Sequence, residues 1–197
     1  MVSFTENEAK TLAFLTRNFS QKYTINQLAK ELNLSPGGMF KILKKLKSQD
    51  FLRSEKIGNG IIYKINFDSQ EARDVCTISL VQKDISPYLR ALIKDLQIFK
   101  DKTQIAILFG SILKKENEAR DIDILLVFEK KKFNAVEQGI ENLNKIKTKK
   151  IHAVYQTKED LIKNIHKCDK VILEEIKTGV ILWGRRELVE VIKNGQS

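Results

Sequence analysis

Hydrophobic residues recur every three or four positions through the first fifty residues, which is the spacing of amphipathic helices. A first helix is predicted to begin at Thr5, which stands with Glu8 in capping-box order. A second helix follows Thr24. A third follows Ser35 and Pro36, which supply an N-cap and a first-turn proline. The start of the chain is therefore expected to form three short helices.

The pattern then changes to two β-prone runs, residues 51–53 and 61–67, on either side of an Asn59-Gly60 turn. Such a turn between β-prone runs predicts a hairpin. Two more helices are predicted over residues 68–82 and 86–100. No Pro/Gly-rich tether interrupts them, so we expect ordered helix rather than flexible chain at this point.

Beyond residue 102, short apolar strands alternate with helical patterns, which indicates a layered α/β domain. Strands are expected at 104–110, 121–129 and 150–156, helices at 134–147, 158–167, 170–178 and 185–193, and a short apolar segment at 179–184. The expected fold class is α/β (α+β) with a mixed C-terminal sheet. The expected units are a first domain over residues 1–67, a helical linker over 68–100 and a second domain over 101–197.

Charge is concentrated toward the N-terminus. The formal net charge is +10, and residues 1–66 hold 11 Lys or Arg against 5 acidic residues. A basic unit of this kind is typical of a partner for a polyanion, although a generally lysine-rich composition explains the charge equally well. The first residues lack the order of a secretory signal, and no apolar run is long enough to span a bilayer, so we expect a cytoplasmic protein without a membrane partner.

The order of three helices and a hairpin, together with the segment LNLSPGGMFKILKKLKSQDFL, resembles winged-helix transcription regulators over residues 5–66. In that class the third helix enters the major groove of double-stranded DNA and the hairpin reaches the neighbouring backbone or groove. The resemblance implies the following DNA-binding candidates: Gly37, Gly38, Phe40, Lys41, Lys44, Lys45, Lys56 and Asn59. Winged helices also serve as protein-protein modules, and this alternative stays open.

A second constellation consists of Gly110-Ser111 after one apolar strand and Asp121-x-Asp123 at the start of the next. Alternate side chains of a strand point to the same face, so the two carboxylates are expected side by side, where they can hold two divalent ions. The Gly-Ser turn offers backbone N–H groups and a hydroxyl to phosphates, and is expected to open into a helix or a turn. A structural turn and a strand cap are the plainer explanations of the same residues.

This combination resembles the polymerase-β nucleotidyltransferases, in particular their minimal prokaryotic branch, over residues 86–190. The resemblance implies that Asp121 and Asp123 are catalytic residues that bind Mg²⁺. It also implies that Gly110 and Ser111 bind the phosphates of ATP or another nucleoside triphosphate, and that Lys114 takes the place of an arginine usual in the family.

The chain departs from the family pattern at the third carboxylate, which is expected on the strand at 150–156 and is absent there. His152 is the titratable group closest to that position, and a lone His beside an apolar strand is more often a packed or surface residue. Without the third carboxylate the second ion and the general base are weakened.

Three functions follow from these patterns. The first is Mg²⁺-dependent transfer of a nucleotide to a hydroxyl acceptor. The second is a DNA-binding transcription regulator whose transferase-like domain senses nucleotide or mediates assembly. The third is an antitoxin-like partner of a small helical protein, as minimal nucleotidyltransferases often have. Winged-helix regulators commonly dimerise on DNA, so a homodimer is also considered.

Overall fold

The computed structural model describes residues 4–58, 60–82 and 84–196. The chain divides into two compact units, Met1–Leu80 and Val81–Ser197, which are described separately. Within the described residues, no helix combines the length and the apolar character needed to cross a bilayer.

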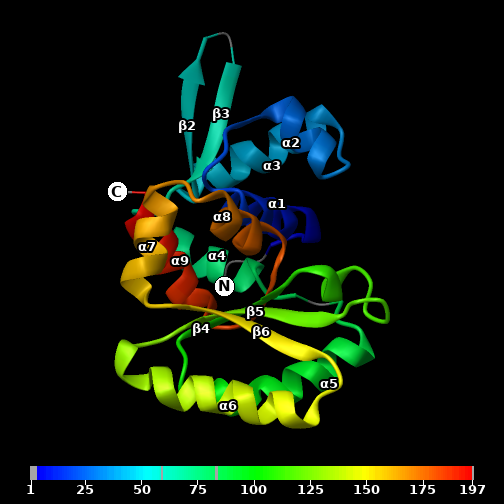
Figure 1. The fold of residues 1–197 in the computed structure, drawn as a ribbon. Coiled ribbons are helices and arrows are strands. Elements are labelled where there is room, and N and C mark those ends of the chain that lie inside the picture. The colour runs from blue at the N-terminus through cyan, green and yellow to red at the C-terminus, as the bar shows by residue number, and fades with distance from the viewer. Residues whose placement is uncertain (1–3, 59, 83, 197) are drawn as a thin grey trace. The chain divides into compact units, whose positions relative to one another are not determined.

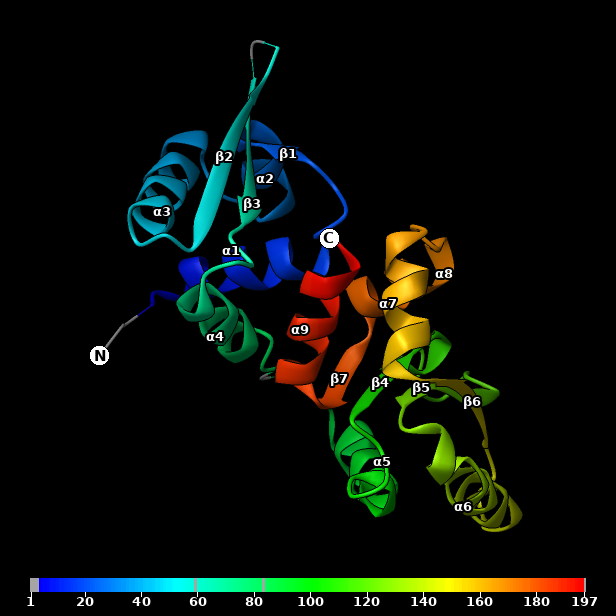
Figure 2. The ribbon, with the colours of Figure 1, turned by 90° about the vertical axis from the view of Figure 1, so that its left-hand side faces the viewer.

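The first unit is a winged helix, as the sequence predicts. Its elements are α1 (Glu6–Arg17), β1 (Tyr23–Thr24), α2 (Ile25–Glu31), α3 (Pro36–Ser48), β2 (Leu52–Ile57), β3 (Gly60–Ile65) and α4 (Gln70–Ser79). The strands form an antiparallel sheet in the order β1-β3-β2, and β2 and β3 extend as a hairpin beside the helices (Figure 2). The hairpin is the wing.

Local signals in the sequence explain where these helices begin. The side chain of Thr5 accepts a hydrogen bond from the Glu8 N–H, and Glu8 accepts one from the Thr5 N–H, which completes the expected capping box. Ser35 caps α3 by accepting from the Gly38 N–H, and Pro36 occupies the first turn. The apolar stripe of α3 is buried, which turns its lysine-rich face outward.

The second unit is a layered α/β domain. It contains α5 (Pro87–Leu96), η1 (Gln97–Phe99), β4 (Ile105–Phe109), η2 (Ser111–Leu113), β5 (Asp121–Val127), η3 (Lys130–Lys132), α6 (Phe133–Ile146), β6 (Lys150–Gln156), α7 (Lys158–His166), α8 (Lys170–Thr178), β7 (Val180–Trp183) and α9 (Arg185–Gly195). The sheet order is β6-β5-β4-β7, with β5 and β6 parallel and the other pairs antiparallel. The sheet is therefore mixed, as expected.

Helices cover both faces of this sheet (Figure 1). On one face, α5 and α6 pack on the even positions of β4 and β5 around the fully buried Phe99. On the other face, α8 and α9 contact β4, and α7 contacts β6. Asp121 and Asp123 are odd positions of β5 and lie on this second face, because successive side chains of a strand alternate.

The two helices that follow β3 and precede β4 in the chain, α4 and α5, belong to different cores. The α4 residues Ala72, Val75 and Cys76 are buried within the first unit, whereas α5 contributes to the apolar core of the second unit. Each helix is thus integrated into one compact unit.

Candidate active site

Strand pairing brings three candidate side chains to one end of the sheet. Asp121 and Asp123 lie at the start of β5, where Phe109 at the end of β4 pairs with Asp123. On the other side, β6 runs parallel to β5 and places His152 opposite Asp123. The Gly110-Ser111 turn follows Phe109 directly, so it lies beside the same carboxylates.

His152 faces both carboxylates. Its Nδ1 lies 3.3 Å from Oδ2 of Asp121 and 4.0 Å from Oδ1 of Asp123. One ligand atom from each of the three residues lies within 4.8 Å of the others, a spacing that suits one divalent ion. The His152 side chain is 63% exposed, so it is a surface residue as the sequence suggests, but its position against the aspartates was not expected. His152 thus lies on β6, the strand on which a third carboxylate was expected.

The surroundings of Asp123 disfavour the ionised form of its carboxylate. Desolvation by burial raises its pKa above the ordinary value, and the neighbouring Asp121 raises it further, while His152 acts in the opposite direction. The two aspartates are only partly exposed, at 34% and 27% of their side chains. A cation between them relieves this repulsion, so the electrostatics fit a divalent ion.

Gly110 is the residue that makes room for Asp123. Its φ is 82° and its ψ is −160°, a conformation that is essentially restricted to glycine. A Cβ at this position would overlap Oδ2 of Asp123 and would lie 3.1 Å from its Cγ and 3.2 Å from its Cβ. The close approach of backbone and carboxylate therefore depends on the absence of a side chain.

Ser111 and Lys114 are exposed beside this turn. The turn continues as η2, a 3-10 helix of only three residues, rather than as a longer helix. Both residues line a cavity of about 890 Å³ together with Gly110 and residues of α8. A phosphate group can therefore reach the Ser111 hydroxyl and the Lys114 ammonium from the same cavity.

Glu175 of α8 lines the same cavity and was not foreseen from the sequence. It is 5% exposed, and its Oε2 has no hydrogen-bond partner among the described residues. Burial raises its pKa to about 7, and the charges of Asp169 and Asp123 contribute to the rise. The run LEEI does not distinguish a buried glutamate from an exposed one. The only available signal is helical spacing, which puts Glu175 on the same side of α8 as the buried Ile172 and Ile176.

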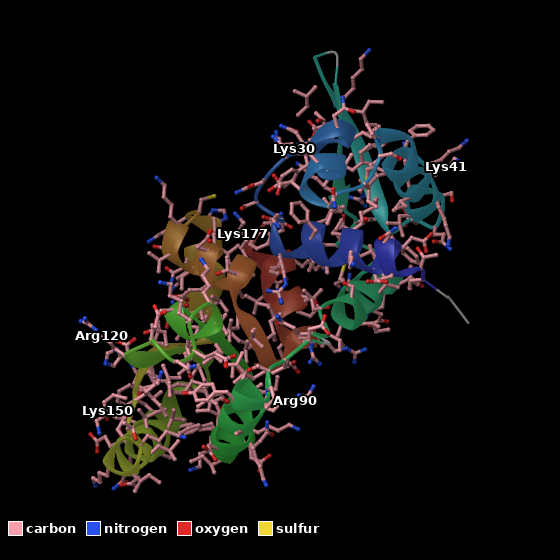
Figure 3. All side chains as sticks on the ribbon, turned by 90° about the vertical axis from the view of Figure 1, so that its right-hand side faces the viewer. Lys30, Lys41, Arg90, Arg120, Lys150 and Lys177 are labelled. Carbon is pink, nitrogen blue, oxygen red and sulfur yellow. The ribbon has the colours of Figure 1, made fainter. Side chains whose placement is uncertain are left out.

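The candidate DNA interface lies on the other unit. Along α3, Gly37, Phe40, Lys41 and Lys44 are exposed, with Phe40 at 48%, and Gly38 is half-buried. Figure 3 shows Lys41 on the outer side of α3. On the wing Lys56 is exposed, whereas Asn59 lies outside the described residues.

Lys45 has a structural partner. Its Nζ lies 2.8 Å and 2.9 Å from the two carboxylate oxygens of Glu8, which is buried in the capping box of α1. Burial alone would raise the pKa of Glu8, but the hydrogen bonds from Lys45 and Thr5 outweigh it and hold the pKa below its ordinary value. This lysine therefore ties α3 to α1.

Residues 92–187 match the family model described as "Polymerase beta, Nucleotidyltransferase". The matched region runs from α5 into α9 and contains the carboxylates, the Gly-Ser turn, His152 and Glu175. It is thus similar to a nucleotidyltransferase domain, in agreement with the motifs. The chain joins a winged-helix unit to a unit with this nucleotidyltransferase-like region.

The solved structures that the comparison matched include the adhesin competence repressor of Streptococcus pyogenes. It is 17% identical, with 72% of this chain and 80% of that chain covered and a TM-score of 0.34. A zinc-responsive MarR family member of Lactococcus lactis is also 17% identical, with 74% and 77% covered and a TM-score of 0.33. At these TM-scores neither likeness supports a conclusion about fold or function. No curated protein matches the chain.

Proposed function

We propose that this protein is a nucleotidyltransferase that binds a nucleoside triphosphate with a divalent ion, Mg²⁺ as the family implies, and transfers the nucleotide to a hydroxyl acceptor. The observation that carries the proposal is the convergence of Asp121, Asp123 and His152 on one point beside the Gly110-Ser111 turn. The match of residues 92–187 to the nucleotidyltransferase family supports the same reaction class.

Each residue of the site has its own role in the proposed reaction. Asp121 and Asp123 hold the ion, which when bound lowers the pKa of an attacking hydroxyl and neutralises phosphate charge. Ser111 and Lys114 orient the phosphates by a hydroxyl and a point charge. His152, on the strand where the resemblance led us to expect a third carboxylate, supplies a nitrogen ligand next to both aspartates.

One observation favours a second candidate function. An imidazole carries less negative charge than a carboxylate, so the Asp-Asp-His set holds a second divalent ion more weakly than three carboxylates would. A site of this kind suits a domain that binds nucleotide and reports it to a DNA-binding unit without fast turnover. The winged-helix unit, with its basic α3 face, is proposed to bind double-stranded DNA in either case.

Calorimetric titration with a non-hydrolysable ATP analogue tests the proposed nucleotide site. Binding is expected to require Mg²⁺ and to be weakened on the order of 100-fold or more in the Asp121→Ala/Asp123→Ala variant, because the ion loses both carboxylate ligands. The charge-matched control is Asp101→Ala/Glu141→Ala, which removes two exposed acids of the same unit and is expected to bind normally. Equal binding by all three proteins would contradict the proposed site.

Turnover separates the two candidate functions. A labelled nucleoside triphosphate incubated with the protein and hydroxyl acceptors is expected to yield a transferred nucleotide if the protein is an enzyme. Binding without transfer would support the sensing function instead.

The DNA interface makes a separate prediction. Lys41→Ala/Lys44→Ala is expected to lower the slope of log affinity against log salt concentration by about 2, because each phosphate contact contributes about 0.9 to that slope. Fluorescence anisotropy with duplex DNA over a salt series measures this. Lys10→Ala/Lys22→Ala removes the same charge elsewhere on the unit and is expected to change the slope less. An unchanged slope in the α3 variant would remove these lysines from the interface.

A further inference from the structure

The cavity beside the Gly-Ser turn is large enough for more than phosphate. Its volume is about 890 Å³, near the upper end of the range for small-molecule sites. Much of its wall is apolar, contributed by Ile85, Leu89, Phe109, Leu113, Val171 and Val180. An apolar wall does not contact a triphosphate favourably, so this part of the cavity suits an uncharged planar group.

One carboxyl oxygen in this wall has no hydrogen-bond partner among the described residues. Glu175 is 5% exposed, lines the cavity and has an Oε2 that accepts no hydrogen bond among the described residues. A buried carboxyl oxygen without a partner is costly, and a bound ligand, an ion or an ordered water can supply the missing donor. The neighbouring Asp169 is already engaged, because its Oδ1 caps α8 by accepting from the N–H groups of Val171 and Ile172.

Cations line the same cavity. Lys114 follows the Gly-Ser turn, and Lys170 begins α8. A ligand with an anionic part near Ser111 and Lys114 and an aromatic, hydrogen-bonding part near Glu175 matches this arrangement of charges. A nucleotide has both parts.

We propose that this cavity binds the purine base of a nucleoside triphosphate and that Glu175 recognises the base through its Watson–Crick edge. The inference rests on the proposed nucleotide site and adds the class of base and the residue that selects it. A bicyclic base covers more of the apolar wall than a pyrimidine does. The Watson–Crick edge of adenine or guanine also carries an N–H group that can donate to the unpartnered Oε2 of Glu175.

The protonation of Glu175 determines which purine fits best. A neutral carboxyl donates to adenine N1 and accepts from its N6 amine, whereas a carboxylate accepts from both N1 and N2 of guanine. The pKa of about 7, raised by burial and by Asp169 and Asp123, leaves both forms accessible near neutrality. The charged groups that line the cavity or act on Glu175 are Asp84, Lys114, Lys170, Glu174, Asp169 and Asp123.

Titration of the full chain with ATP, GTP, CTP, UTP and inorganic triphosphate, each with Mg²⁺, at pH 6 and pH 8 tests the inference. One purine nucleotide is expected to bind on the order of tenfold or more tightly than CTP and UTP. Adenine recognition predicts weaker binding at pH 8, and guanine recognition predicts tighter binding at pH 8. Either result supports the proposal, whereas equal affinity for all four nucleotides overturns it.

Two substitutions assign the selectivity to Glu175. Glu175→Leu keeps the site apolar and is expected to remove the purine preference while inorganic triphosphate binds as before. Glu175→Gln keeps one donor and one acceptor, so adenine binding is expected to persist without its pH dependence and guanine binding to weaken. A purine preference that survives Glu175→Leu overturns the proposal. Failure of inorganic triphosphate to bind the unmodified chain would instead contradict the proposed nucleotide site itself.

Discussion

Gly110→Ala is expected to weaken Mg²⁺-dependent binding of a nucleotide analogue by about 100-fold, because it displaces a metal ligand by part of an ångström or more. The new Cβ would overlap Oδ2 of Asp123 and crowd its Cγ at 3.1 Å. The carboxylate would have to rotate away from His152 and Asp121, or the turn would have to move. The φ of 82° adds strain of about 1–3 kcal/mol for a residue with a side chain.

Gly184→Ala is the matched control for that strain. Gly184 also has a positive φ, 79°, and its Cβ would overlap the Gln104 carbonyl oxygen and lie 2.7 Å from the Ile105 Cα. This clash lies at the opposite end of β4 from Gly110. Thermal unfolding is expected to show a loss of stability in both variants, and calorimetry a loss of nucleotide binding only for folded Gly110→Ala. Normal binding by Gly110→Ala would show that the carboxylate position does not depend on this glycine.

Glu175→Gln is expected to be more stable than the unmodified protein by up to about 3 kcal/mol at pH 8 and by less than about 1 kcal/mol at pH 5. Burial, with help from the charges of Asp169 and Asp123, raises the folded-state pKa from 4.5 to about 7. The neutral side chain is therefore favoured in the folded protein. The contribution of Glu175 to the free energy of unfolding is complete below pH 4.5 and is lost as the pH rises through 7. Glutamine does not ionise, so the variant shows no such loss.

Chemical denaturation at a series of pH values measures this difference. Glu141→Gln removes an exposed carboxylate on α6, across the sheet, and is expected to show no comparable gain at pH 8. If Glu175→Gln changes the free energy of unfolding equally at pH 5 and pH 8, then ionisation of Glu175 is not penalised by the fold. A nucleotide that pairs with the carboxyl would shift this pH dependence further.

Most elements of this protein could be predicted closely from local signals, although the helix expected over residues 68–82 ends at Ser79. Thr5, Ser35 and Ser86 each cap the helix that the sequence predicts at that point. The strands of the second unit begin and end within two residues of their expected positions, because each is a short apolar run beside Gly, Asp or Lys. Caps and strand periodicity depend on neighbours in the chain, so they can be recognised without tertiary structure.

Some residues of the candidate site could likewise be recognised from the sequence, whereas others could not. Asp121, Asp123 and Gly110-Ser111 could be identified from sequence because their spacing along two adjacent strands is itself the signal. His152 is brought to them by the parallel register of β5 and β6, and Glu175 is buried by the packing of α8 against β4. Register and helix packing are set by contacts between segments distant in the chain. The sequence by itself therefore determined the elements and the paired carboxylates, and only the tertiary structure decided which imidazole and which buried acid accompany them.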